Sequence, residues 1–258
     1  MALLNKNNIF KEVRFFKKET RPKKVIFDHL PKCGGLSLYP YLDSNYPQRK
    51  IFTINGVQPE QSILEFQSKS KKKKSNYFLI KGHLANELFE YIPSNFLKIT
   101  MLRDPIDRVI SHYFYAKNMP HHYLYSQIHS SNINLEQYVS LGITDEVRNW
   151  YTTHFSGLPL EIVKSEPEIS LTKAITNILN HFDLIGFLDE YFLFATELKK
   201  IAGYRKSFNN IKINTSKKRL KKNEIASSII NKIEINNEVD ILLYAHLKKI
   251  NKLFITKN

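Results

Sequence analysis

The chain of 258 residues is long enough for one sizeable α/β domain, whose core needs no disulfide or metal to fold. Its single cysteine, Cys33, excludes an intramolecular disulfide framework and a cysteine-based zinc site. The formal net charge of +15 indicates an anionic partner, although charge alone does not identify that partner.

The first 23 residues read as a basic N-terminal extension without an apolar signal segment. No later stretch reaches the roughly 20 apolar residues that a membrane-spanning helix needs. We therefore expect a basic, soluble, cytoplasmic protein with no transmembrane segment, folded as a single domain over residues 24–258.

Five β-rich runs end in polar or glycine-containing turns, and helical patterns separate them. This alternation predicts an α/β fold with a central, mainly parallel sheet flanked by helices and a helix-rich C-terminal half. The runs are "KVIFDHL" at 24–30, "KIFTIN" at 50–55, "NYFLIKGH" at 76–83, "LKITMLR" at 97–103 and "HFDLIGFL" at 181–188.

The loop "PKCGGLS" at 31–37 directly follows the first strand. Ligands of open parallel sheets bind beyond the carboxyl ends of the strands, where this loop lies. Gly34 and Gly35 allow a close backbone approach, the next helix begins with amides that favour an anion, and Lys32 adds a mobile charge. The loop suits a phosphate or sulfate group. It is not the P-loop of NTPases, in which the Lys follows the last Gly.

The third strand ends in Gly82 and His83. A histidine at this edge has a pKa range that suits taking a proton from a hydroxyl near neutral pH. A lone histidine is usually structural, and only its position beside the other sites favours His83 over His29, His112 and His154.

The segment "LRDPIDRVISHYFY" at 102–115 places Arg103 at the end of the fourth strand. Asp104 and Pro105 then predict the start of a helix that continues to residue 118. At 3.6 residues per turn, Ser111 points about 130° away from the centre of the apolar stripe of that helix, so it could share an anion with Arg103. The alternative pairs Arg103 with Asp104 or Asp107 and leaves Ser111 without a role.

Further helices are expected in the C-terminal half of the chain. Acceptor pockets are built by variable loops, which are expected here at 116–133 and 156–170. The expected helices cover 134–142, 144–155, 171–182, 189–204 and 229–254.

Together, "HLPKCGG", "KGH" and "LRDPIDRVISHYFY" resemble sulfotransferases that use 3′-phosphoadenosine 5′-phosphosulfate (PAPS), and most closely the carbohydrate-modifying branch that includes heparan sulfate 2-O-sulfotransferase. The likeness continues through "EVRNWYTTHFSG", "INTSKKR" and "NEVDILLYAHL", and covers about residues 24–254. It implies a P-loop-like three-layer fold and transfer of a sulfuryl group from PAPS to a hydroxyl, on a saccharide or glycolipid.

The resemblance also implies roles for individual residues. The donor-binding residues would be Lys32, Cys33, Gly34, Gly35, Leu36, Ser37, Arg103, Ser111, Lys217 and Arg219. His83 would be the catalytic base, and Lys32 would stabilise charge on the bridging oxygen. Fixed cations and helix amides can stabilise a sulfuryl group without Mg²⁺, and the sequence shows no carboxylate cluster for a metal.

Family loops usually read Pro-Lys-Thr-Gly-Gly-Thr-Ser, whereas this chain has Cys33 and Leu36 where the two Thr residues stand. Two hydroxyl contacts to the donor are therefore missing. The sequence leaves open a P-loop-like phosphotransferase and a non-catalytic homologue that binds an anion or nucleic acid. A specific nucleic-acid site is not expected, because the aromatic spacing matches a helix core stripe.

Overall fold

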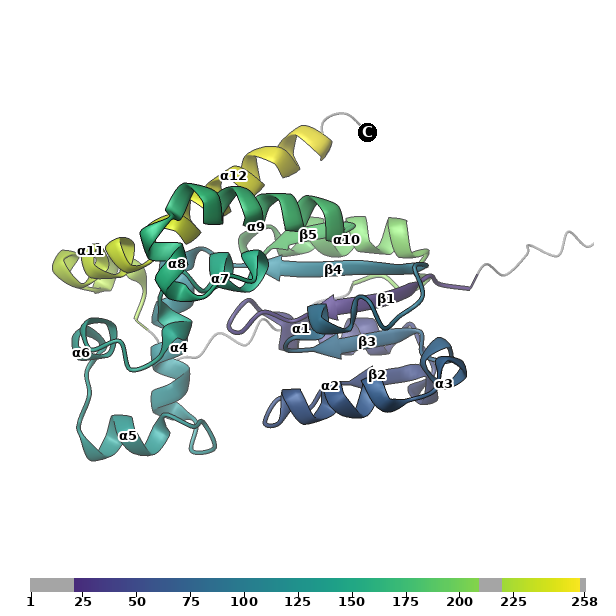
Figure 1. Ribbon diagram of the computed structural model, residues 1–258, viewed down its shortest axis with the longest axis horizontal. Coiled ribbons are helices and arrows are strands. Elements are labelled where there is room, and N and C mark those ends of the chain that lie inside the picture. The colour runs from purple at the N-terminus through teal and green to yellow at the C-terminus, as the bar shows by residue number, and fades with distance from the viewer. Residues whose placement is uncertain (1–20, 209–219, 256–258) are drawn as a thin grey trace, which may run out of the picture.

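The computed structural model describes residues 21–208 and 220–255. Its central sheet has the strand order β2-β3-β1-β4-β5, and all neighbouring strands are parallel (Figure 1). The expected fold class is confirmed, and four strands fall within the runs that predicted them, while β4 begins one residue before its run. The strands are β1 (Lys24–Asp28), β2 (Ile51–Thr53), β3 (Leu79–Gly82), β4 (Phe96–Leu102) and β5 (Leu184–Phe187).

Helices cover both faces of this sheet because its strands are apolar on both sides. The described helices that flank or extend the sheet, with five short 3₁₀ turns, are α1 (Gly35–Asp43), η1 (Gln48–Lys50), α2 (Pro59–Ser68), α3 (Lys71–Ser75), η2 (Ala85–Leu88), α4 (Pro105–Asn118), α5 (Tyr125–Ser130), α6 (Leu135–Ser140), η3 (Asp145–Val147), α7 (Trp150–Ser156), α8 (Leu160–Ser165), α9 (Pro167–His181), η4 (Leu188–Glu190), α10 (Tyr191–Ala202), η5 (Lys222–Glu224), α11 (Ser227–Asn236) and α12 (Glu238–Ile255).

The two faces of the sheet have separate apolar cores. Val25 and Phe27 of β1 are fully buried in one core with α1 and α10. Ile26 points to the opposite face, where it packs with α2 and η2. On that same face, Leu102 of β4 packs with α7, α9 and α12. The molecule therefore has the three layers that the sequence predicts.

A fourth apolar cluster lies beyond the carboxyl ends of the strands. It is built mainly from α4, α5, α6 and α11, which Figure 1 shows past the arrowheads of the sheet. The helix α4 begins as expected, since the Asp104 carboxylate accepts a hydrogen bond from the Asp107 amide at 3.0 Å. This helical layer forms one wall opposite the edge of the sheet where ligands bind in such folds.

A helix junction, formed by Asn149, Asn237 and Asp240, joins α7 to α12. The Asp240 carboxylate accepts hydrogen bonds from the Tyr151 and Thr152 amides at 2.9 and 2.8 Å, and so caps α7. In return, the Asn149 side-chain oxygen accepts from the Val239 and Asp240 amides at 3.1 and 3.2 Å and caps α12. The two helices therefore cap each other.

The helix junction explains where two expected helices are wrong. The expected helix at 144–155 breaks at Asn149, which has a φ of 41° that Asn tolerates better than most residues. The expected helix at 229–254 breaks at Asn237, whose side chain donates to the Val147 and Ile233 carbonyls at 2.9 Å each. Side-chain hydrogen bonds to the backbone thus end both helices.

Residues 69–74 form a basic run, "KSKKKK", whose last four residues lie in the exposed helix α3, which precedes β3. Figure 1 shows α3 at the amino ends of the strands, away from the ligand-binding edge. Within residues 21–208 and 220–255, no helix has the length and apolarity needed to cross a membrane.

Candidate active site

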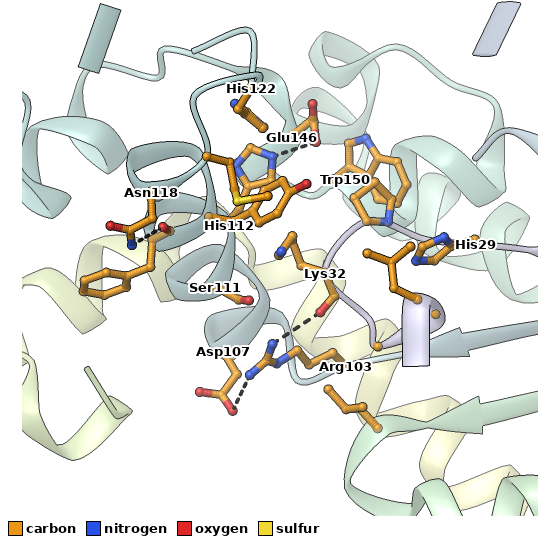
Figure 2. A pocket seen from close by; sticks show the side chains of 18 of the residues that line it. His29, Lys32, Arg103, Asp107, Ser111, His112, Asn118, His122, Glu146 and Trp150 are labelled. Atoms are coloured by element: carbon orange, nitrogen blue, oxygen red, sulfur yellow. Dashed lines mark hydrogen bonds and ion pairs between the residues drawn. The ribbon is translucent and has the colours of Figure 1, made fainter. Parts of the chain in front are cut away.

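A cleft of about 2080 Å³ lies between the carboxyl ends of the strands and the helical layer, with α4 along one wall. Figure 2 shows side chains that line it, with Lys32 near the centre. Eight of the residues predicted from the sequence line this cleft: Lys32, Gly34, Gly35, Leu36, Ser37, His83, Arg103 and Ser111.

The anion loop, residues 31–37, has a backbone that only certain residues can adopt. Lys32 and Gly34 both have positive φ angles, of 65° and 82°. A side chain at Gly35 would lie 2.1 Å from the His29 ring, so this position requires glycine. The first turn of α1 has neither a side-chain cap nor an acidic residue. Its amides therefore face the cleft as an anion site without a competing negative charge.

Lys32 lies against an aromatic ring instead of a carboxylate. Its Nζ is 3.4 Å from the centroid of the Tyr115 ring on α4. Burial, together with the nearby Arg103 charge, lowers the pKa of Lys32 to about 8. Lys32 is thus a partly desolvated cation whose attraction to an anion is strong.

Arg103 is held at the end of β4 by several contacts. Its Nη1 donates to the Lys32 carbonyl at 3.3 Å, and its Nη2 lies 3.8 Å from the Asp107 carboxylate. Figure 2 shows Asp107 and Ser111 on α4 beside this guanidinium. The buried Nε of Arg103 has no hydrogen-bond partner among the described residues. The expected pairing with Asp107 therefore exists, and it leaves part of the guanidinium available for an anion.

Cys33 does not line the cleft. Its thiol is buried 3.0 Å from the Tyr151 hydroxyl, and its amide donates to the Leu30 carbonyl at 3.3 Å. The Tyr151 hydroxyl also donates to the Arg103 carbonyl at 3.0 Å. Cys33 thus ties the anion loop to the end of β4, and the prediction that it contacts the donor has no support from this geometry.

His83 lies at the end of β3 with one ring nitrogen fixed. Its Nδ1 is 2.6 Å from the His29 carbonyl oxygen. Because a carbonyl can only accept, Nδ1 must carry the proton, and the neutral ring keeps its lone pair on Nε2. His83 also stacks on His29 with ring centroids 4.5 Å apart. The Nε2 atom is therefore the one that can accept a proton.

His29 holds the ring of His83 in place. Its ring is buried, and its Nδ1 lies 3.0 Å from the Tyr39 hydroxyl. Burial, with the nearby His83 and Lys32 charges, holds the pKa of His29 well below its usual range. His29 is therefore a neutral packing surface for His83.

His154, which no sequence pattern singles out, also lines the cleft. Its Nε2 lies 2.8 Å from the buried Asp28 carboxylate, and its ring stacks on Trp150. The two partners are 126 residues apart in the chain, so no local motif could show the pair. His154 is a second histidine that could act on a substrate hydroxyl.

A further polar group lies farther along α4. His112 Nε2 and the Tyr123 hydroxyl are each 2.8 Å from the Glu146 carboxylate (Figure 2 shows the His112 contact). Burial opposes ionisation of Glu146, but these hydrogen bonds and the charges of His112 and Arg108 lower its pKa to about 2. Glu146 is thus a fixed negative charge in the cleft wall.

The strand order divides the cleft into two sides. The β4 side carries Arg103, Ser111, Lys221 and Lys222, and the β2 side carries Gly56, Val57, Pro59 and Glu60. The ends of β1 and β3, with Lys32 and His83, lie between them. In Figure 1, α4 runs from the end of β4 toward the level of α2, and Asn118 and Met119 at its C-terminal end line the same cleft.

Two other predictions have mixed outcomes. Lys217 and Arg219 lie outside the described residues, while their neighbours Leu220 to Asn223 line the cleft. Of the expected acceptor loops, 116–133 contributes Asn118, Met119 and the residues 121–123, whereas no residue of 156–170 lines the cleft. That second segment instead forms α8 and the start of α9.

An uncapped helix N-terminus, two cations and a histidine of defined tautomer meet at one edge of the parallel sheet, an arrangement that suits an anionic ligand beside a group able to accept a proton. Comparison with protein families agrees, since residues 15–252 match the model of the sulfotransferase family. The match covers most of the chain, and the protein belongs to this family. The family assignment supports sulfotransfer as its reaction.

Among solved structures, a sulfotransferase from Alicyclobacillus acidocaldarius is similar to this chain at 14% sequence identity and a TM-score of 0.43. The similarity covers 86% of this chain and 96% of that one. None of the curated protein sequences matches this chain. In the described part of the chain, no group of three or more His, Cys, Asp or Glu side chains is placed to hold a metal ion.

Proposed function

We propose that the protein transfers a sulfuryl group from PAPS to a hydroxyl of a saccharide or glycolipid, with His83 as the base. One observation carries the proposal. The uncapped start of α1, the partly unpaired Arg103 and the free Nε2 of His83 converge on one cleft.

The two ends of the donor have separate places in this proposal. The amides of the anion loop and Lys32 would hold the 5′-phosphosulfate, because helix amides and a desolvated cation favour a concentrated negative charge. Arg103 and Ser111, with the neighbouring Lys221, would hold the 3′-phosphate on the β4 side. Arg103 has a buried Nε that still needs an acceptor, which a phosphate oxygen would supply.

In the transfer step, the acceptor oxygen bonds to sulfur as the bond from sulfur to the bridging phosphate oxygen breaks. His83 Nε2 takes the proton of the acceptor hydroxyl, and the leaving phosphate keeps the electron pair of the broken bond. Lys32 stabilises the charge that grows on the bridging oxygen, where a fixed cation acts most strongly. His29 orients the base through its carbonyl, which fixes the proton on Nδ1 of His83.

The acceptor class rests on the motif likeness to the carbohydrate-modifying branch. The cleft is consistent with it, since a volume of about 2080 Å³ exceeds what a small alcohol would fill beside the donor. The β2 side lies next to His83 and away from Arg103, and so would receive the acceptor.

Calorimetry tests the donor. We expect 3′-phosphoadenosine 5′-phosphate (PAP) to bind at least about tenfold more tightly than 5′-AMP, because a second phosphate would meet Arg103 and Ser111. Ser111→Ala should reduce that ratio, whereas Lys72→Ala, which removes an exposed charge on α3, should not. Equal affinities for PAP and 5′-AMP would contradict the donor assignment.

The same purified protein can be used to distinguish a sulfotransferase from a phosphotransferase and from a nucleic-acid-binding homologue. Radiolabelled PAPS incubated with a glycan panel should give a labelled product, and a phosphotransferase would instead use ATP. A nucleic-acid-binding homologue would retard DNA or RNA in a gel at physiological salt, and binding lost at that salt would reflect only nonspecific charge attraction.

A further inference from the structure

The charges that line the cleft are unevenly distributed between its two sides. Among the described residues, the Lys and Arg side chains that line it are Lys32, Arg103, Lys221 and Lys222. Apart from the central Lys32, all of them lie on the β4 side, where the proposed donor binds. No described Lys or Arg therefore faces the side left for the acceptor.

The β2 side carries negative charge instead. Glu60 lines the cleft in the first turn of α2, where the helix dipole stabilises a carboxylate. The Glu60 carboxylate would repel a second anion placed beside His83.

His122, at this end of the cleft, does not offset that charge. Burial, with the neighbouring His112 charge, lowers the pKa of His122 to about 4, so its ring is neutral at physiological pH. Glu146, which has a pKa of about 2, adds a carboxylate to the same wall. Figure 2 shows His122 and Glu146 on the opposite side of Lys32 from Arg103.

Exposed apolar side chains surround the opening. Val57 on the β2 side is 84% exposed, and Leu36 at the start of α1 is 60% exposed. Met119 and Tyr123, which follow α4, are 42% and 64% exposed and also line the cleft. Apolar surface of this kind around a polar site favours a ligand with an apolar part next to its reacting group.

We infer that the acceptor is an uncharged glycoside with an apolar aglycone, and not a polyanionic glycan. The inference rests on the proposed sulfotransfer reaction and names the acceptor class of the same site. It departs from the heparan sulfate branch that the motifs resemble, because an acidic polysaccharide needs cations along its path. The described acceptor side offers the carboxylates of Glu60 and Glu146, the neutral ring of His122 and apolar side chains.

Two matched glycosides test this inference. Octyl β-glucuronamide and octyl β-glucuronide have the same ring hydroxyls and nearly the same size, and differ in the charge at C6. With PAPS as donor, we expect kcat/KM for the glucuronamide to exceed that for the glucuronide by at least about tenfold, since like charges across an interface are strongly disfavoured. Desulfated heparin should be a poor acceptor, comparable to the glucuronide.

Variants locate the cause of the preference. Glu60→Gln should reduce the ratio of the two kcat/KM values by about three- to tenfold, because it removes a charge facing the glucuronide. Glu161→Gln on α8 removes an exposed charge away from the cleft and should leave the ratio unchanged. A ratio that Glu60→Gln leaves unchanged would overturn the role of this carboxylate.

Equal or better transfer to the glucuronide or to desulfated heparin would overturn the inference and leave the sulfotransferase proposal standing. Failure of the glucuronamide to bind the PAP-loaded protein in calorimetry would also overturn it. Failure of the protein to bind PAP would instead overturn the proposed function, and with it the inference. The PAP measurement therefore distinguishes the two failures.

Discussion

The helix junction and the cleft differ in how completely their polar groups are paired. In the helix junction, the side chains of Asn149, Asn237 and Asp240 all have hydrogen-bond partners within the chain. In the cleft, Arg103 keeps a buried Nε without a partner among the described residues, and Lys32 lies on a ring face. A buried polar group is costly unless it is paired. The paired groups of the helix junction therefore stabilise the fold. In the cleft, Arg103 and Lys32 keep donors that an anion can pair with.

This difference predicts that cleft variants change activity without changing stability, and that junction variants do the reverse. The largest effect is expected for His83→Ala. Loss of a general base lowers kcat by about 10²- to 10⁴-fold. The affinity for PAP should change by less than about twofold, because the base contacts the acceptor and not the nucleotide. Single-turnover transfer and calorimetry measure the two quantities.

The matched control is His246→Ala, which removes an exposed imidazole from α12 and should leave kcat unchanged. If His83→Ala retained most of its activity, the base would have to be another histidine in the cleft. His154, held by Asp28 at 2.8 Å, would then be the first to test.

The second prediction concerns the helix junction. Asp240→Ala removes the acceptor for the Tyr151 and Thr152 amides and for the Thr152 hydroxyl, all of them buried. Leaving these donors unpaired should cost about 3 kcal/mol of unfolding free energy. For a chain of this size, the melting temperature should fall by about 6–12 °C, measurable by thermal denaturation.

Glu238→Ala provides the control, since it removes an exposed carboxylate from the same turn of α12 and should cost about 0.5 kcal/mol or less. PAP affinity measured on folded Asp240→Ala protein should match the parent within about twofold, as the junction does not line the cleft. If a variant of Asp240 had a normal melting temperature but bound PAP poorly, the assignment of stability to the helix junction and of binding to the cleft would be contradicted.

Local sequence patterns predicted the parts of the fold that depend on neighbouring residues. The five strands followed from short apolar runs, and the start of α4 from Asp104 and Pro105. The ends of helices near the junction were wrong because Asn149 and Asn237 act through partners about 90 residues away. Propensity alone cannot show a cap that arrives from another helix.

In the candidate site too, sequence patterns predicted what the strand order sets and missed what distant partners set. Topology placed Lys32, His83 and Arg103 at one edge of the sheet, so their presence in one cleft could be predicted. The burial of Cys33 against Tyr151 could not, because a loop residue can point either into the cleft or into the core. In the position where family loops have a Thr, this thiol faces Tyr151 and not the cleft.

The third prediction uses the pKa of Lys32, which lies at about 8. Below this pH the amine is charged and attracts PAP, and above it the free protein loses the charge. Affinity for PAP should therefore fall about tenfold between about pH 7 and about pH 9. In Lys32→Arg the guanidinium stays charged, so the affinity should be flat over the same range. A parent protein with equally flat affinity would show that Lys32 does not contact the nucleotide.

The smallest effect is expected at Tyr115, whose ring lies 3.4 Å from the Lys32 Nζ. A cation over an aromatic face gains about 1 kcal/mol, so Tyr115→Leu should weaken PAP binding by about fivefold. Loss of the ring also removes a contact that favours the charged amine, and the pH at which affinity begins to fall should therefore decrease. Tyr115→Phe keeps the ring and should preserve both values. An effect of the Leu variant on affinity without a change in the pH profile would indicate altered packing of α4 and not a role in positioning Lys32.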